Sequence, residues 1–375
     1  MLLALTFLLF CFVIWRMIWP LKVKWYIKVL LALPLAAGAF KFQCFRVLGG
    51  HYFSPDLPGW IILGGAWLYG GFYFIPPMLF FSEAVRFFKF RNEQKIWNHV
   101  NAVIIIAATL LSAVAIGFGA ADPRVTCYTV EHPQLPAAAD GMKVAFITDL
   151  HIDHTTDAGK IHALVEKVNS LGADLITCGG DLMDGSVEKC GSKLKILTGL
   201  KAPFGVLGIP GNHEYYSGAE EWFGFFSKNS PELLINKSVT LPNGVIVAGV
   251  GESVARKFFR YSPELAKKYG EDAEGVLKNI PREKFVLFLA HRPKAALESR
   301  EFGADLQLSG HTHGGMIRGF DLLVGLYNCG WVSGRYKTKD LTLIVSNGTW
   351  LWRGFPLRLG RPGEILLVTL KRAGK

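Results

Sequence analysis

The sequence predicts an α/β fold in its C-terminal part, preceded by a helical transmembrane region. The chain has 375 residues, 50% of them hydrophobic, and the apolar excess lies almost entirely before about residue 121. After Met142, short apolar runs alternate with polar loops and with segments of helical period. We therefore expect a transmembrane region over 1–121, a linker with a first strand over 122–141, and an α/β domain over 142–375.

Four apolar stretches of the N-terminal region approach the roughly 20 residues that a helix needs to cross a bilayer. They cover residues 2–19, 25–40, 57–81 and 100–121. The second is the weakest candidate because it is short and contains Lys28 and Pro34. The alternative for the first stretch is a cleaved signal peptide, but no basic residue precedes it, and Lys22 and Lys24 follow it instead of a small-residue cleavage site.

Basic residues predict how the chain is oriented, because short loops rich in lysine and arginine stay cytoplasmic. The loop between the third and fourth stretches is the most basic, and the loop between the first two adds further lysines. With four spans, both loops lie on one side and the C-terminal domain lies on the outer face of the cell membrane. If the second stretch does not cross, the domain lies inside. The basic residues of the loop between the third and fourth stretches are Arg86, Lys89, Arg91 and Lys95, and those of the loop between the first two are Lys22 and Lys24.

Composition gives no indication of nucleic-acid binding or of a cysteine-based framework. The formal net charge is +11, but no basic stripe with interleaved aromatic residues indicates nucleic-acid binding. Membrane loops and an anionic substrate explain the charge. The six cysteines show neither zinc-ribbon spacing nor a dense disulfide framework. No feature indicates an obligatory protein partner.

Five short apolar runs of the α/β domain are predicted to be strands: residues 143–148, 175–178, 205–209, 285–290 and 305–308. Between the first two, apolar residues at helical spacing mark one face of a helix: Ile161, Leu164, Val165 and Val168. In layered α/β folds, ligands collect at the C-terminal ends of the strands, where loops converge. The residues that follow each run are therefore candidates for a ligand site.

Polar clusters follow these strands directly: Asp149 and His151 in D-L-H, Asp181 and Asp184 in G-G-D-L-M-D, Asn212 and His213 in G-N-H-E, His291 in A-H-R-P, and His311 and His313 in G-H-T-H-G-G. Alone, D-L-H or G-D-x-x-D is more often a turn, and a single histidine is more often a surface residue. Taken together, the carboxylate, imidazole and amide groups suit divalent ions such as Mn²⁺, Fe²⁺ or Zn²⁺. The set therefore favours a metal site over five unrelated turns.

In this order the motifs resemble those of the calcineurin-like metallophosphoesterases, over roughly residues 143–370. The G-H-T-H-G-G variant looks most like a membrane-associated bacterial branch that acts on phosphodiesters or lipid-linked diphosphates. The resemblance implies a layered β-sandwich flanked by helices and two divalent ions, with Mn²⁺ favoured. It also implies hydrolysis of a phosphate ester by a hydroxide that the ions share.

Carried over by position, the resemblance assigns Asp149, His151 and His313 to one metal and Asn212, His291 and His311 to the other. Asp181 would bridge the two ions, and its place in the site is therefore also catalytic. His213 would face the substrate and either stabilise developing charge or protonate the leaving oxygen. Asp184 and Glu214 would orient histidine ligands.

The substrate stays open at this point. A lipid or lipid-linked phosphate ester fits the membrane region, and one alternative is a pyrophosphatase of a nucleotide-linked lipid. An alternative of another class is a catalytically silent membrane scaffold or receptor, although all seven ligand positions are filled. Two basic and aromatic segments, residues 256–261 and 350–355, are candidates to contact lipid headgroups, or simply pack.

Overall fold

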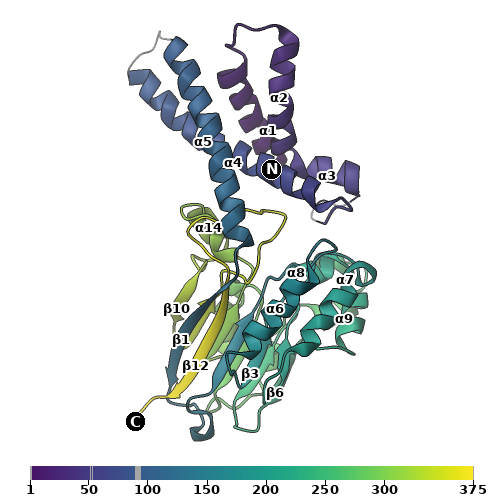
Figure 1. Cartoon of the computed structure of the whole chain (residues 1–375). Helices are drawn as coiled ribbons and strands as arrows, with labels where there is room; N and C mark the ends of the chain where they lie inside the picture. Colours follow the sequence, from purple (N-terminus) through teal and green to yellow (C-terminus); the bar gives the residue numbers. More distant parts are fainter. Residues whose placement is uncertain (1, 51, 53, 89–93, 375) are drawn as a thin grey trace. The chain divides into compact units, whose positions relative to one another are not determined.

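The computed structural model describes residues 2–50, 52, 54–88 and 94–374. The chain divides into two compact units, which are described separately (Figure 1). The helical unit comprises Met1–Ala120 and Arg353–Arg358, and the sheet unit comprises Ala121–Trp352 and Leu359–Lys375. A short segment near the C-terminus therefore belongs with the N-terminal helices.

All four predicted apolar stretches form helices. The helices of this unit are α1 (Leu2–Val13), extended by a π-helical turn over Ile14–Ile18, α2 (Trp25–Ala39), α3 (Lys41–Gly49), α4 (Gly59–Phe88) and α5 (Gln94–Ala120). Among the described residues, α4 and α5 are each long and apolar enough to cross a membrane, and α2 with α3, bent by 82°, would be a third crossing if the pair is one span. The first apolar helix, Leu3–Ile18, is shorter. The number of four spans stays a prediction, and Lys89 and Arg91 of the basic loop lie outside the described residues.

The segment Arg353–Arg358 is held inside the helical unit by a buried lysine. Lys41 Nζ donates to the carbonyl oxygen of Gly354 at 2.8 Å and lies 4.3 Å from the ring centre of Tyr69. The ring of Phe355 meets Tyr69 edge-on. Farther along, the N–H of Arg358 donates to the carbonyl oxygen of Ala115 in α5. These contacts give the segment a fixed place among the helices.

The described strands of the sheet unit form two six-stranded sheets. The first has the order β1-β12-β2-β3-β4-β5, and the second has the order β10-β11-β9-β8-β7-β6. Their bounds are β1 Arg124–His132, β2 Lys143–Ile147, β3 Leu175–Cys178, β4 Val206–Gly208, β5 Glu232–Leu233, β6 Lys237–Thr240, β7 Ile246–Gly249, β8 Val286–Leu289, β9 Leu306–Ser309, β10 Gly334–Thr338, β11 Leu341–Val345 and β12 Glu364–Arg372. The five predicted runs correspond to β2, β3, β4, β8 and β9.

Three buried clusters build the layers of this unit. One core lies between the sheets and contains residues such as Phe146 of β2 and Leu287 of β8. A second joins the first sheet to helices, including α6 (Ala158–Asn169), α7 (Val187–Leu194) and α9 (Ala219–Phe226). A third joins the other sheet to α12 (Ala273–Leu277) and α13 (Ala296–Phe302). The predicted β-sandwich flanked by helices is therefore confirmed.

Strand direction positions the loops that carry the polar clusters. β2, β3 and β4 run parallel to one another, and so do β8 and β9 of the second sheet. The C-terminal ends of parallel strands meet at one edge of a sheet. α6 fits this arrangement because Ile161, Leu164, Val165 and Val168 are all buried, as their spacing predicts.

Candidate metal centre

The structure brings the predicted ligand residues of both sheets together. Ligand atoms of Asp149, His151 and His313 lie within 4.8 Å of one another, and so do those of Asp181, His291 and His311. The backbone N–H of His311 donates to the carboxylate of Asp149, which joins the loop after β9 to the loop after β2. A third such group, His151, Asp184 and His213, shares His151 with the first. The groups therefore form one largely buried site.

Asp181 lies where the two groups meet. Its Oδ2 is 3.2 Å from Nε2 of His291 and 3.9 Å from Nε2 of both His151 and His213. Its Oδ1 accepts the backbone N–H of His213 at 2.8 Å. One carboxylate oxygen is thus held by the backbone while the other faces three imidazole nitrogens.

The backbone adopts an unusual conformation at five of the predicted ligands. Among the described residues, the non-glycine positions with positive φ include Asp149 (55°), His151 (46°), Asp181 (52°), His311 (70°) and His313 (48°). The left-handed region costs a non-glycine residue roughly 1–2 kcal/mol. Such strain persists where surrounding contacts over-determine the conformation, and it concentrates at functional sites.

Two glycines allow the loops to approach these carboxylates. A Cβ atom on Gly211 would lie 2.2 Å from Oδ1 of Asp181, and one on Gly310 would lie 2.3 Å from Oδ2 of Asp149. No side chain fits at either position without moving a carboxylate. The glycines of G-N-H-E and G-H-T-H are therefore required by the packing of the site.

Hydrogen bonds fix which ring nitrogens face the centre. Nδ1 of His291 donates to the carbonyl oxygen of Gly179 at 2.7 Å, and Nδ1 of His151 lies 3.2 Å from Oδ1 of Asp184. Both rings therefore turn Nε2 inwards. Among the described residues, Nε2 of His291 and Oδ1 of Asn212 are buried without a hydrogen-bond partner, since the 3.2 Å approach of His291 to Asp181 lacks hydrogen-bond geometry. Buried polar atoms require partners, and a divalent cation fits both atoms.

Burial and mutual charge shift the pKa values of the cluster. Burial raises the pKa of Asp149. Burial would also raise the pKa of Asp181, but the imidazoles of His291 and His213 outweigh it and hold that pKa well below its ordinary value. Burial would lower the pKa of His213, but the carboxylates of Asp184 and Asp181 raise it to about 9. Groups this strongly perturbed are typical of functional sites.

The two acids expected to orient histidines behave differently. Oδ1 of Asp184 contacts Nδ1 of both His151 and His213, as expected. The expectation is wrong for Glu214, whose carboxylate accepts the backbone N–H groups of Asp181, Leu182 and Gly211. Glu214 therefore ties the loop after β3 to the loop after β4.

Sequence reasoning missed two residues beside the centre. The ring of Trp352 lies 5.6 Å from that of His213 and 6.1 Å from that of His151. Arg292 pairs with Glu252, and its Nη1 lies 3.1 Å from Nε2 of His311. The place of Arg292 directly after His291 in A-H-R-P was the available signal, because phosphate sites use arginine.

Some residues of the two segments proposed to contact headgroups are packed inside the protein. Trp350 is buried in the core beside α6. Phe259 packs partly buried with Tyr215, whereas Phe258 and Tyr261 are exposed. Packing thus accounts for part of each segment.

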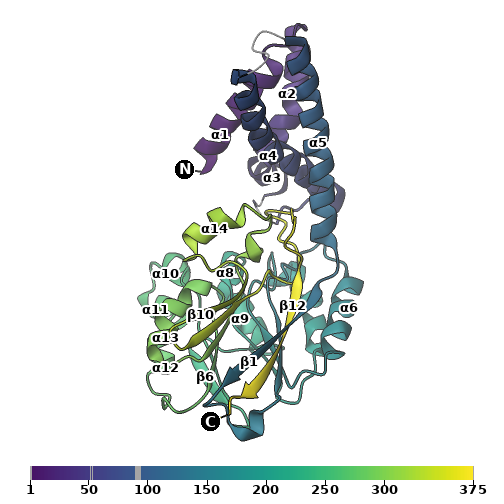
Figure 2. The ribbon, with the colours of Figure 1, turned by 90° about the vertical axis from the view of Figure 1, so that its left-hand side faces the viewer.

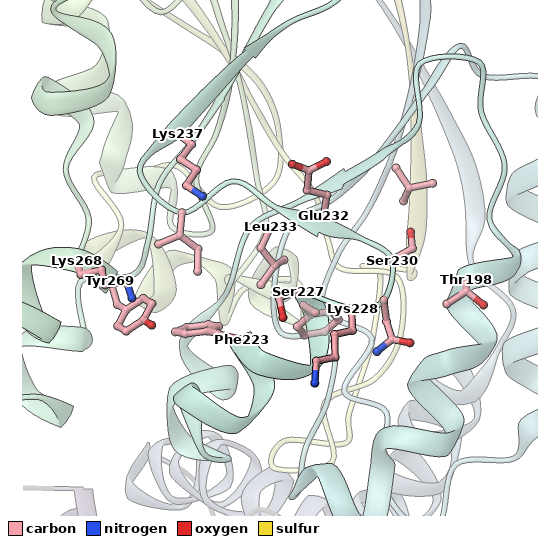
Figure 3. A pocket seen from close by; sticks show the side chains of 14 residues that line it. Thr198, Phe223, Ser227, Lys228, Ser230, Glu232, Leu233, Lys237, Lys268 and Tyr269 are labelled. Atoms are coloured by element: carbon pink, nitrogen blue, oxygen red, sulfur yellow. The ribbon is translucent and has the colours of Figure 1, made fainter.

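A separate hollow of about 820 Å³ lies elsewhere in the sheet unit (Figure 3). It opens beside Val206, where β4 begins, whereas the ligand loops follow the other ends of the strands. Lys228, Lys237 and Lys268 lie around it with Phe223 and Tyr269. It contains none of the predicted ligands among the described residues and takes no part in the centre.

The chain matches the family of calcineurin-like phosphoesterases over residues 142–315. It is 31% identical over 270 residues to an uncharacterised metallophosphoesterase of Campylobacter jejuni. The aligned residues make up 72% of this chain and 68% of that protein. It is 37% identical over 231 residues to an uncharacterised metallophosphoesterase of Helicobacter pylori, with 61% and 60% covered. A transmembrane protein with a metallophosphoesterase domain from Danio rerio is 29% identical over 282 residues, with 72% and 63% covered.

The chain belongs to the calcineurin-like phosphoesterase family, as its motifs predict. It spans about 60% of the length of the Helicobacter relative. The family depends on a pair of metal ions, and the clustered aspartates and histidines of this chain agree with that dependence.

Proposed function

We propose that the protein hydrolyses a phosphate ester, either a phosphodiester or a phosphomonoester, with two divalent ions. The observation that carries this proposal is the position of Asp181, whose Oδ2 faces histidines of both ligand groups. A carboxylate in that position can be shared by two cations. The orphaned Oδ1 of Asn212 and Nε2 of His291 support the same reading.

In this proposal Asp149, His151 and His313 hold one ion, and Asn212, His291 and His311 hold the other, with Asp181 shared. When bound, such ions neutralise phosphoryl oxygens and lower the pKa of water. Carboxylate, imidazole and amide donors suit Mn²⁺, Fe²⁺ or Zn²⁺. We favour Mn²⁺, for which the oxygens of Asp149, Asp181 and Asn212 are suitable donors beside the four imidazoles.

His213 supplies the proton in this proposal. Its Nδ1 lies 2.5 Å from Oδ1 of Asp184, so Asp184 holds a proton on Nδ1 and stabilises the charged ring. Nε2 is then the nitrogen that gives a proton to the leaving oxygen as the phosphorus–oxygen bond breaks. Water supplies the oxygen of the new bond. The products are an alcohol and a phosphate monoester from a diester, or an alcohol and inorganic phosphate from a monoester. Arg292, near His311, is placed to bind a phosphoryl oxygen.

A lipid or lipid-linked substrate is the finer part of the proposal. α4 and α5 are long and apolar enough to cross a membrane, which would keep the sheet unit close to amphiphilic esters. A pyrophosphatase of a nucleotide-linked lipid is the second candidate. The ring of Trp352 beside His213 favours it, because an aromatic face next to a phosphate site can stack on a base.

We further propose a multi-pass membrane protein whose sheet unit lies on the outer face. Basic residues gather where α4 ends and α5 begins: Arg86 in the last turn of α4, Lys95 in the first turn of α5, and Lys89 and Arg91 between them in the sequence. They favour the cytoplasmic side for this end of both helices. α5 then crosses outwards, and β1 begins four residues after its last residue. The placement requires that the second apolar stretch also cross, since otherwise the sheet unit lies inside.

Activity and metal content of the full-length protein in detergent test the proposal. With Mn²⁺ present, we expect hydrolysis of at least one member of a panel containing an aryl phosphodiester, phospholipids and nucleotide-linked lipids, with two bound ions per chain. Asp181→Asn should lower turnover by about three orders of magnitude, while Asp122→Asn, at an exposed position, should not. Wild-type turnover by Asp181→Asn would exclude the shared carboxylate, and metal binding without any hydrolysis would favour the silent scaffold.

A further inference from the structure

The short helix α14 (Asp321–Tyr327) presents apolar side chains to solvent. Leu322, Leu326 and Tyr327 are 75%, 79% and 69% exposed, and Leu323 is 52% exposed. Soluble surfaces rarely gather large apolar side chains this densely, and such patches mark interaction sites. We call these four residues the α14 patch.

The opposite side of α14 fastens it to the sheet unit. Asp321 pairs with Arg361. Gly325 is buried, and a Cβ atom at this position would lie 3.5 Å from Cγ2 of Val332. Asp321 and Gly325 lie four residues apart, on the face opposite the pairs Leu322–Leu326 and Leu323–Tyr327. The helix is therefore held by one face, and the α14 patch is not needed to hold it.

Figure 2 shows α14 at one end of the sheet unit, and the helix begins eight residues after His313. A Cβ atom on Gly315 would lie 2.4 Å from Cα of Asp321, so the start of α14 packs against the turn that follows His313. A movement of α14 would therefore also move the turn that follows His313.

The same end of the sheet unit is tied by a short path to a helix able to cross a membrane. Arg361, which binds Asp321, lies three residues before Glu364, the partner of Arg124 in the sheet. Arg124 begins β1, and α5 ends at Ala120. Four residues of extended chain span at most about 14 Å. The start of β1 therefore stays within that distance of the end of α5.

We propose that the α14 patch inserts into the interfacial layer of the bilayer crossed by the chain's own helices. The short tether from α5 keeps that bilayer within reach, and four large apolar side chains on one face suit the acyl-chain boundary. Tyr327 suits the headgroup level. Asp321, the acid of this helix, is paired with Arg361, and the exposed Arg318 just before it favours anionic headgroups. The inference concerns membrane contact and stands apart from the proposed reaction.

Lipid-dependent quenching of a fluorophore tests the proposal on the full-length chain. Single cysteines replace Leu322, Leu326 or Tyr327 and carry an environment-sensitive label. The matched control is Leu297→Cys, because Leu297 is a 42% exposed leucine on α13. The background carries serine at the cysteines outside the core, which are Cys11, Cys44, Cys127 and Cys329. Each protein is reconstituted in vesicles of phosphatidylcholine and phosphatidylglycerol, with and without a lipid bearing a quencher on its acyl chain.

We expect the quencher lipid to reduce emission from positions 322, 326 and 327 at least about twofold more than from position 297. Equal quenching at all four positions would overturn the proposal. Burial of the labels in detergent alone, increasing with protein concentration, would show that a second copy covers the patch and would also overturn it. An unchanged circular dichroism spectrum checks that each labelled protein is folded, and agreement between three separate positions guards against a local perturbation.

Discussion

Oδ1 of Asp184 lies 2.5 Å from Nδ1 of His213, and both groups are buried. The same oxygen atom lies 3.2 Å from Nδ1 of His151. One carboxylate thus sets the orientation of a predicted ligand and of the predicted proton donor. Its removal should disturb both, but to different degrees.

Asp184→Asn should lower kcat/KM for an aryl phosphodiester by about 10- to 100-fold, the usual cost of losing a group that orients a ligand. The effect should largely disappear when His213 is already alanine, because the shorter of the two contacts no longer exists. Kinetics of the wild type, both single variants and the double variant measure this coupling.

Metal content separates the two roles in the same set of proteins. His213→Ala should retain both ions, whereas Asp184→Asn should weaken binding through His151. Loss of an ion from His213→Ala would make His213 a ligand. Strictly additive losses of activity would show that Asp184 and His213 act separately.

The strands and the ligand motifs of this chain could be predicted because their signals are local. A run such as residues 175–178 is apolar and ends in glycine, and it forms β3. The polar groups at strand ends need only the parallel arrangement to converge, so Asp149 and His311 meet although 162 residues separate them. Short patterns and one topological rule were sufficient.

Other features depend on contacts that leave no local pattern. Lys41 directly follows an apolar stretch in the sequence, yet its Nζ binds a carbonyl oxygen 313 residues away. Trp352 resembled a headgroup anchor, because an aromatic residue beside arginine suits both a membrane surface and a site wall. The exposure of Leu322 and Leu326 was equally hidden, since the sequence of α14 looks like that of a buried helix.

Gly211→Ala should inactivate the enzyme while preserving its fold. The added Cβ would meet Oδ1 of Asp181, so the shared carboxylate must shift by a distance that a catalytic site does not tolerate. We expect turnover to fall at least about 100-fold, with an unchanged circular dichroism spectrum. Gly224→Ala is the matched control, because no atom lies within 4 Å of its Cβ position. Full activity of Gly211→Ala would contradict the packing inferred for the loop after β4.

Lys41→Met should release the segment Arg353–Arg358 from the helical unit. The carbonyl oxygens of Arg353 and Gly354 would lose a buried donor, at a cost of about 1–3 kcal/mol. Trypsin should then cleave after Arg353 or Arg358 at least about tenfold faster, as followed by mass spectrometry of the protein in detergent. Lys24→Met, at an exposed position, should leave cleavage unchanged. Equal cleavage of both variants would show that the lysine does not hold the segment.

Asp305→Asn should change how stability depends on pH. Oδ2 of Asp305 accepts the backbone N–H of Val286 at 2.7 Å, and burial raises the pKa of Asp305 to about 6, against roughly 4 in an unfolded chain. The folded state therefore holds this proton more tightly. Its contribution to stability is complete below about pH 4 and is lost as the pH rises through about 6.

Asparagine at position 305 does not titrate. The unfolding free energy of the variant minus that of the wild type should therefore rise by up to about 3 kcal/mol from pH 4 to pH 7. Thermal midpoints of both proteins across that range measure the change. Asp122→Asn, at an exposed position, should keep a constant offset from wild type. The same constant offset for Asp305→Asn would mean that the buried carboxyl group is ionised throughout, with its charge balanced by a neighbour such as His132, whose Nε2 lies 3.4 Å away.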